Sequence, residues 1–146
     1  MRIALYSEIA RKNIAETREF ISKKGYDNSP KDIRECRTEI MNMTTDSNSR
    51  MQTIINSKDF YSLSACRDLL FHVQEHRFTL PQISNALKKM GLIFIGFDCG
   101  SQIENQFKAQ YPGNEDLFSL ELWHQFEQDH PDTFVRMYQF WVQKNN

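Results

Sequence analysis

The chain has 146 residues, which is enough for one ordinary domain but not for two. Its formal net charge is −1, with 18 Lys and Arg against 19 Asp and Glu, and no basic stripe stands out, so the sequence does not support a nucleic-acid-binding surface. The longest apolar run, near residues 92–97, is far too short to span a membrane, and the N-terminus lacks the apolar stretch of a signal peptide. We therefore expect a soluble, cytoplasmic protein.

The first part of the chain predicts a short strand followed by helices. Residues 2–6 form an apolar strand, and Ser7 is expected to cap a helix that runs toward Lys24 and stops at Gly25. Ser29-Pro30-Lys31-Asp32 has the form of a capping box with proline at the first helical position. This motif predicts a second helix over residues 30–43.

The next segment predicts a loop and two further helices. The polar residues 44–49 are expected to form a mobile loop, and a short helix is expected around residues 51–55. Ser62 or Ser64 then begins a helix with an apolar face. The three cysteines are odd in number and widely spaced, which predicts free thiols in a reducing compartment; they are Cys36, Cys66 and Cys99.

Residues 79–98 predict a capped helix followed directly by a buried strand. Thr79 can cap the helix, Pro81 suits one of its first positions, and Gly91 can take the left-handed conformation that ends it. The strand over residues 92–98 and the one over residues 2–6 are the two strong strand candidates. A pair of strands among so many helices looks like the last part of a larger α/β sheet.

The C-terminal third is rich in aromatic residues and predicts helices only. Phe134, Met137, Tyr138 and Trp141 fall at i, i+3, i+4 and i+7, which places them on one helical face. We expect this face to pack onto the rest of the domain, and the alternative is an aromatic surface for a partner or substrate.

One short motif could hold a metal. His72-Val-Gln-Glu75-His76 matches the His-x-x-Glu-His pattern of inverted zinc peptidases, in which the two histidines lie four residues apart on a helix. A third ligand is normally a distant glutamate. Glu121 and Glu127 lie downstream, but nothing in the sequence marks either of them as part of a helix built around such a site. A motif of this length often matches by chance, so we expect no metal and a helix end whose imidazoles bond to backbone carbonyls or face water.

Two other kinds of chemistry have little support. Cys66 sits at an apolar position six residues from His72, which favours a buried, inert thiol over a nucleophile. The five glycines are not spaced as a phosphate or dinucleotide cradle requires. Tyr6-Ser7-Glu8 follows the first strand and would face a ligand crevice if the sheet is parallel, although helix capping accounts for Ser7 and Glu8 without a ligand.

Several segments resemble one family. Met1-Arg-Ile-Ala-Leu-Tyr-Ser-Glu-Ile-Ala-Arg11 resembles the late strand and following helix of class I S-adenosylmethionine-dependent methyltransferases. Residues 60–83, Phe60-Tyr-Ser-Leu-Ser-Ala-Cys at their start, are similar to a segment of bacterial methyltransferases, some of them fused to tetratricopeptide repeats. Residues 87–96 resemble the late helix and strand of that fold, and residues 132–141 resemble the same group's C-terminal tail.

The resemblance covers only the late part of that fold. Family members bind the methyl donor through a glycine-rich loop after the first strand and an acidic residue after the second. Neither is found here, because the similarity begins at about the fifth strand. No cofactor-binding residue can therefore be transferred to this chain, and S-adenosylmethionine is implied for the full-length family only.

The resemblance implies a mostly helical α/β fold. Residues 1–100 would form the late portion of a Rossmann-like methyltransferase sheet with about two strands, and residues 101–146 an aromatic-rich helical extension packed on it. The implied function is the substrate side of a methyltransferase, without methyl transfer of its own. The alternative is a helical module that binds a protein partner through its aromatic tail or an exposed strand edge. The substrate-side candidates are Tyr6, His72, His76 and Arg77.

A sheet of two strands has open edges. If residues 2–6 and 92–97 were its only strands, each would lack a neighbour, and an open apolar edge recruits another strand. We therefore expect self-association, most simply as a two-fold homodimer.

Overall fold

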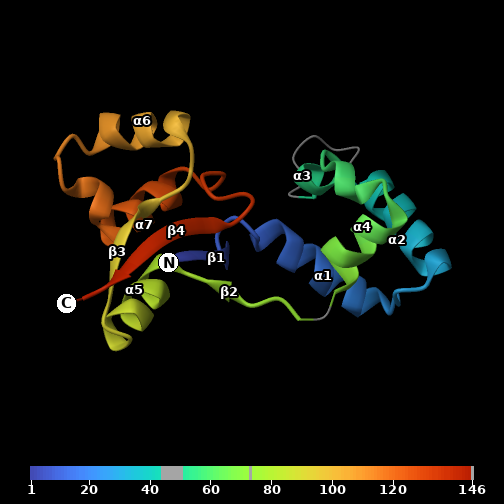
Figure 1. The fold of residues 1–146 in the computed structure, drawn as a ribbon. Helices are drawn as coiled ribbons and strands as arrows, with labels where there is room; N and C mark the ends of the chain where they lie inside the picture. The colour runs from blue at the N-terminus through green and yellow to red at the C-terminus, as the bar shows by residue number, and fades with distance from the viewer. Residues whose placement is uncertain (44–50, 73, 146) are drawn as a thin grey trace. The chain divides into compact units, whose positions relative to one another are not determined.

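The computed structural model describes residues 1–43, 51–72 and 74–145, and Figure 1 shows its ribbon. The chain forms two compact units. The sheet unit contains Met1–Arg11 and His76–Asn146, and the helical unit contains Lys12–Glu75. The sequence suggested a boundary between two regions of the chain at residue 100, and this residue lies inside the sheet unit. The predicted loop over residues 44–49 lies outside the described residues.

The described residues of the sheet unit form a mixed four-stranded sheet in the order β2-β1-β4-β3. Strand β1 (Arg2–Ser7) pairs in parallel with β2 (Arg77–Phe78), and β4 (Tyr138–Lys144) runs antiparallel to both β1 and β3 (Leu92–Phe97). Strands β1, β2 and β3 therefore share one direction. The expected two-stranded sheet is wrong, because β4 lies between β1 and β3 and pairs with both.

The error concerns the C-terminal residues, which form a strand and not the predicted helix. Their apolar side chains follow a period of two: Tyr138, Phe140 and Val142 are buried, whereas Trp141 is 49% exposed. The spacing from Phe134 to Trp141 fits a helical face equally well, so the pattern alone was ambiguous. Pairing with β1 and β3 decides the conformation, because it satisfies the inner backbone groups of both neighbours.

Local signals predicted the helices of the sheet unit better. Helix α5 (Leu80–Lys89) begins at a capping box in which Thr79 and Gln82 exchange hydrogen bonds, and it ends before Gly91 at φ 65°. Helix α6 (Ser101–Gln110) follows Gly100, and α7 (Leu120–Asp129) is capped by the side chain of Ser119. A short 3-10 turn, η3 (Asp116–Phe118), precedes α7.

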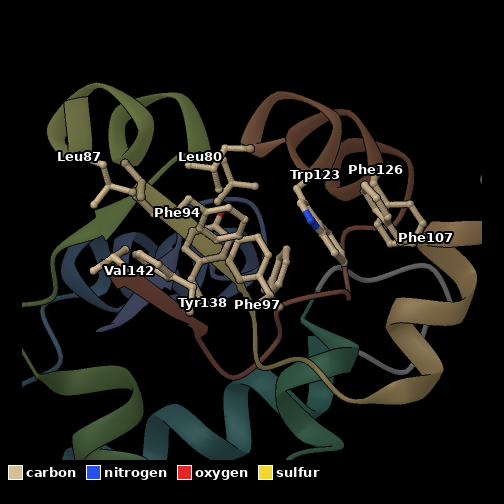
Figure 2. Close-up of a cluster of buried hydrophobic side chains, with 13 residues drawn as sticks. Leu80, Leu87, Phe94, Phe97, Phe107, Trp123, Phe126, Tyr138 and Val142 are labelled. Atoms are coloured by element: carbon tan, nitrogen blue, oxygen red, sulfur yellow. The ribbon is translucent and has the colours of Figure 1, made fainter. Parts of the chain in front are cut away.

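Aromatic side chains form much of the sheet unit's core (Figure 2). The ring of Phe97 lies 5.1 Å from Trp123, 4.6 Å from Phe134 and 5.8 Å from Phe140, measured between centroids. Phe107 stacks on Trp123 at 3.8 Å. Most aromatic side chains of the C-terminal third therefore pack into the core, which agrees with the expectation that they pack onto the rest of the domain.

The helical unit has a separate core, built around α1 (Lys12–Lys24) and α2 (Pro30–Met43). Helix α2 has the predicted bounds. Helix α1 begins later than predicted, because Ser7 is the last residue of β1 and its Oγ accepts from the backbone N of Ala10 in a turn.

The rest of the helical unit consists of short helices. Helix α3 (Gln52–Ile55) confirms the short helix expected there, and η1 (Lys58–Phe60) follows it. Helix α4 (Leu63–Cys66) is capped by Ser62 and continues into a π-helical turn, η2 (Arg67–Phe71). None of the helices in the described residues is long and apolar enough to cross a membrane.

Candidate functional site

The carboxyl ends of β1 and β2 bring two of the predicted site residues together. Tyr6 pairs with Arg77 and Ser7 with Phe78 in the parallel register, and the backbone N of Glu8 donates to the carbonyl of Phe78 at 2.9 Å. Residues opposite each other in a parallel pair project from the same face of the sheet, so Tyr6 and Arg77 lie on one face of this strand end.

The guanidinium of Arg11 lies over the ring of Tyr6. Arg11 stands 4.4 Å from the centroid of the Tyr6 ring, which is the geometry of a cation–π contact. The backbone N of Arg11 donates to the carbonyl of Ser7 at 3.1 Å, so the turn after β1 holds Arg11 over the strand end. Guanidinium groups beside a phenol suit the binding of a carboxylate or phosphate oxygen.

A buried polar cluster lies on the opposite face of the same strand end. The hydroxyl of Ser7 donates to Oε1 of Glu127, and the hydroxyl of Tyr138 lies 2.9 and 2.7 Å from the two carboxylate oxygens. All three side chains are fully buried. The cluster joins β1, α7 and β4, and it fixes the end of β1 that carries Tyr6.

Burial raises the pKa of Glu127 above its ordinary value, and hydrogen bonds from Ser7 and Tyr138 oppose this shift. Burial also raises the pKa of Tyr138. A carboxyl group in such surroundings retains a proton to higher pH than an exposed one. Its contacts are with Ser7 and Tyr138, so we assign it a positioning role at the strand end.

Sequence reasoning did not single out Glu127 or Tyr138 for this cluster. The sequence does indicate that Glu127 is buried. It lies seven residues after Leu120 and four after Trp123, on the apolar face of α7. A charged residue at an inward position requires partners. The sequence could not reveal that these partners come from the first strand and the last.

His72 lies in the helical unit, directly after the π-helical turn. Two hollows of about 490 and 390 Å³ share the side chains of Asn28, Phe71 and His72. The guanidinium of Arg18 donates to the carbonyl of Leu69 from Nε at 3.1 Å and from Nη2 at 2.7 Å. Polar side chains line much of both hollows, and π-helical turns are frequent at functional sites.

The His-x-x-Glu-His motif does not have the geometry of a zinc site. His72 has extended backbone angles, φ −74° and ψ 124°, so the helix ends before it. Glu75 forms an ion pair with Arg18 at 3.2 Å, and His76 belongs to the sheet unit. Among the described residues, no group of three potential metal-ligating side chains comes together.

The cysteines are free thiols with little reactivity. Cys36 and Cys66 are fully buried in the helical unit, and burial raises the pKa of Cys36 to about 12. Burial also raises the pKa of Cys66. A thiol that stays protonated is a poor nucleophile, which supports the inert assignment.

The structure thus unites Tyr6 and Arg77 at one strand end, with the exposed His76 preceding Arg77, while His72 lines hollows of the helical unit. No protein-family model matches the sequence, and no curated protein is significantly similar to it.

Proposed function

We propose that this chain is the C-terminal, substrate-side portion of a cytoplasmic S-adenosylmethionine-dependent methyltransferase and does not transfer methyl groups by itself. The observation that carries the proposal is the pairing of Tyr6 with Arg77 at the shared carboxyl end of two parallel strands. In open α/β sheets, ligands bind in the crevice outside these ends. The sheet is mixed, with β4 antiparallel to both of its neighbours, so only the parallel pair of β1 and β2 supports the proposed Rossmann-like relationship.

The proposed substrate is a molecule with an anionic group. Arg11 and Arg77 supply guanidinium groups, and Tyr6 supplies a hydroxyl at the same place. Guanidinium groups bind carboxylate and phosphate oxygens with paired, charge-assisted hydrogen bonds. The hydrogen bonds of Glu127 with Ser7 and Tyr138 hold the end of β1 in position. We therefore infer that this site orients the substrate and does not take part in the reaction itself.

The proposal that this chain transfers no methyl group rests on the turn after β1. A methyl-donor site of the expected kind needs a glycine-rich turn after a strand, and residues 8–11, which follow β1, contain no glycine. Gly25 and Gly91 have positive φ angles at helix ends, and Gly100, with φ 84°, is a single glycine in the turn between β3 and α6 rather than a glycine-rich loop.

The first test is binding. Calorimetric titration of the chain with S-adenosylmethionine is expected to show no stoichiometric binding, and tight binding would overturn the proposal. The DNA upstream of the Met1 codon is expected to encode an in-frame glycine-rich strand-turn-helix. Its absence would also overturn the proposal.

The second test concerns the site in the longer enzyme. Arg77→Gln is expected to raise the KM for the methyl acceptor about tenfold, with the KM for S-adenosylmethionine unchanged. Arg136→Gln, at an exposed position of the sheet unit, is the matched control. Equal kinetics for both variants would remove Arg77 from the substrate site.

The alternative is a module that binds a partner through its aromatic tail. Phe134, Tyr138 and Phe140 are buried in the core, whereas Phe118 and Trp141 are 55% and 49% exposed and would be the rings available to a partner. Binding of a partner through an exposed strand edge does not depend on the methyltransferase proposal.

A further inference from the structure

Strand β3 is the outer strand on one side of the sheet. It pairs with β4, and within the described residues it has no ladder partner on its other side. A strand in this position presents alternate backbone N–H and C=O groups outward, which template the addition of another strand.

The sequence of this edge has neither a charged residue nor a proline to block strand pairing. Leu92-Ile-Phe-Ile-Gly-Phe97 is apolar throughout, and its one irregularity is a register shift between Phe94 and Gly96, toward its C-terminal end. Ile93 is 41% exposed and Ile95 is 37% exposed, so the outer face is apolar as well. A segment of this kind is stable in water when it is covered.

The two ends of β3 carry opposite charges. Lys88 and Lys89 are exposed just before the strand. Asp98 follows the strand directly and pairs with Arg2 at 2.8 Å, and Glu104, which lines a hollow together with Phe97, lies 3.8 Å from the exposed Lys108. An antiparallel copy of the same strand would therefore bring basic residues against acidic ones at both ends.

The hollow at the C-terminal end offers a place for one more side chain. It measures about 240 Å³, and its apolar walls include Ile95, Leu117 and Phe118. In an antiparallel pair, this hollow would face the residues that precede β3 in the second copy. Met90 lies there and is 59% exposed, and its flexible thioether suits an irregular apolar hollow.

From these four features we propose that β3 pairs with β3 of a second copy of this chain, antiparallel and across a two-fold axis. The interface is isologous, so every contact occurs twice. Backbone hydrogen bonds join the strands, Met90 of each copy enters the hollow of the other, and Lys88 and Lys89 approach Glu104. The two sheets then form one continuous sheet of twice the width.

The test is the dimer dissociation constant, measured by light scattering after size exclusion over a range of concentrations. Ile93→Lys is expected to raise this constant at least about tenfold, because the charge is desolvated when the edges pair. Val135→Lys changes a residue of similar exposure away from β3, and it is expected to leave the constant unchanged. Thermal unfolding of both variants verifies that they are folded.

Charge reversal tests the orientation. Lys88→Glu with Lys89→Glu is expected to weaken the dimer, and the further change Glu104→Lys is expected to restore it. Amide exchange in the original protein is expected to slow along residues 92–97 as the concentration rises. A strict monomer, a dimer indifferent to Ile93→Lys, or protection confined to other segments would each overturn the proposal.

Discussion

The hydroxyl of Tyr138 lies within hydrogen-bonding distance of both carboxylate oxygens of Glu127, at 2.9 and 2.7 Å, inside the core of the sheet unit. Tyr138 is the first residue of β4 and Glu127 lies in α7, so the contact fastens a helix to the sheet. Ser7 donates to the same carboxylate from the end of β1. The polar cluster therefore sets the place where Tyr6 and Arg77 meet.

Glu127 is expected to give the sheet unit a pH-dependent stability. Its pKa is raised in the folded protein, chiefly by burial, above the ordinary value of 4.5. Above that value the unfolded chain releases a proton that the folded chain retains, so this group's contribution is lost as the pH rises through the folded pKa. Glu127→Gln carries no such proton, and its stability should decline less with rising pH.

The measurement is the free energy of unfolding in urea, taken for both proteins between about pH 4 and pH 8. The difference between them isolates Glu127, because the other titrating groups are common to both. Parallel profiles would contradict the assignment of a raised pKa.

Tyr138→Phe removes one of the two hydroxyl groups that donate to Glu127 and retains the buried ring. We expect a loss of about 1–3 kcal/mol in the free energy of unfolding, because the buried carboxylate loses a donor. Tyr111→Phe is the matched control, since the hydroxyl of Tyr111 accepts a hydrogen bond from the exposed side-chain amide of Gln110. Equal losses in the two variants would show that the cluster contributes nothing.

Local signals predicted the helices well, because caps and breakers act over a few residues. The Thr79 capping box begins α5 as expected, and the Ser29-Pro30 motif begins α2. The conformation of β4 could not be obtained in this way. Its apolar spacing fits both a helix and a strand, and pairing with distant strands settles the choice.

The candidate site was predicted only in part for a related reason. Tyr6 and Arg77 are identifiable as polar residues next to apolar segments. Their pairing depends on β1 and β2, which are separated in sequence by the whole helical unit. No local pattern encodes a register between segments so far apart. The sequence singled out Glu127 only as a glutamate downstream of the histidine motif. Its role in the buried cluster was missed because its partners come from both ends of the chain.

Arg18→Met tests the π-helical turn of the helical unit. The side chain of Arg18 makes two hydrogen bonds with the carbonyl of Leu69 and an ion pair with Glu75. We expect the free energy of unfolding to fall by about 2–3 kcal/mol, because charged donors to a partly buried carbonyl are lost. Lys23→Met breaks an exposed pair with Glu19 and should change it by less than about 0.5 kcal/mol. Circular dichroism during urea unfolding measures both, and equal effects would contradict the role of Arg18.

His72 and His76 are expected to hold no zinc in solution. The helix ends before His72, and Glu75 is paired with Arg18, so the geometry of a helical metal motif is lacking. Elemental analysis of the purified protein measures this directly. A content of about one zinc per chain that disappears on replacing either histidine with alanine would contradict the prediction.

Phe97→Ala is expected to be the most damaging of these substitutions. The ring of Phe97 lies at the centre of the aromatic core, with centroids 5.0 Å from Phe94 and 4.6 Å from Phe134. Its removal leaves a cavity that neighbouring rings, fixed in two strands and a helix, fill only partly. The free energy of unfolding should therefore fall by about 3–5 kcal/mol.

The control for this prediction is the same substitution at an exposed ring. Phe118 is 55% exposed, and Phe118→Ala should cost less than about 0.5 kcal/mol. Urea unfolding followed by tryptophan fluorescence suits both variants, because Trp123 lies 5.1 Å from Phe97 and reports on the core. If Phe97→Ala costs no more than Phe118→Ala, the aromatic rings do not form the rigid core on which the sheet and the strand-end site depend.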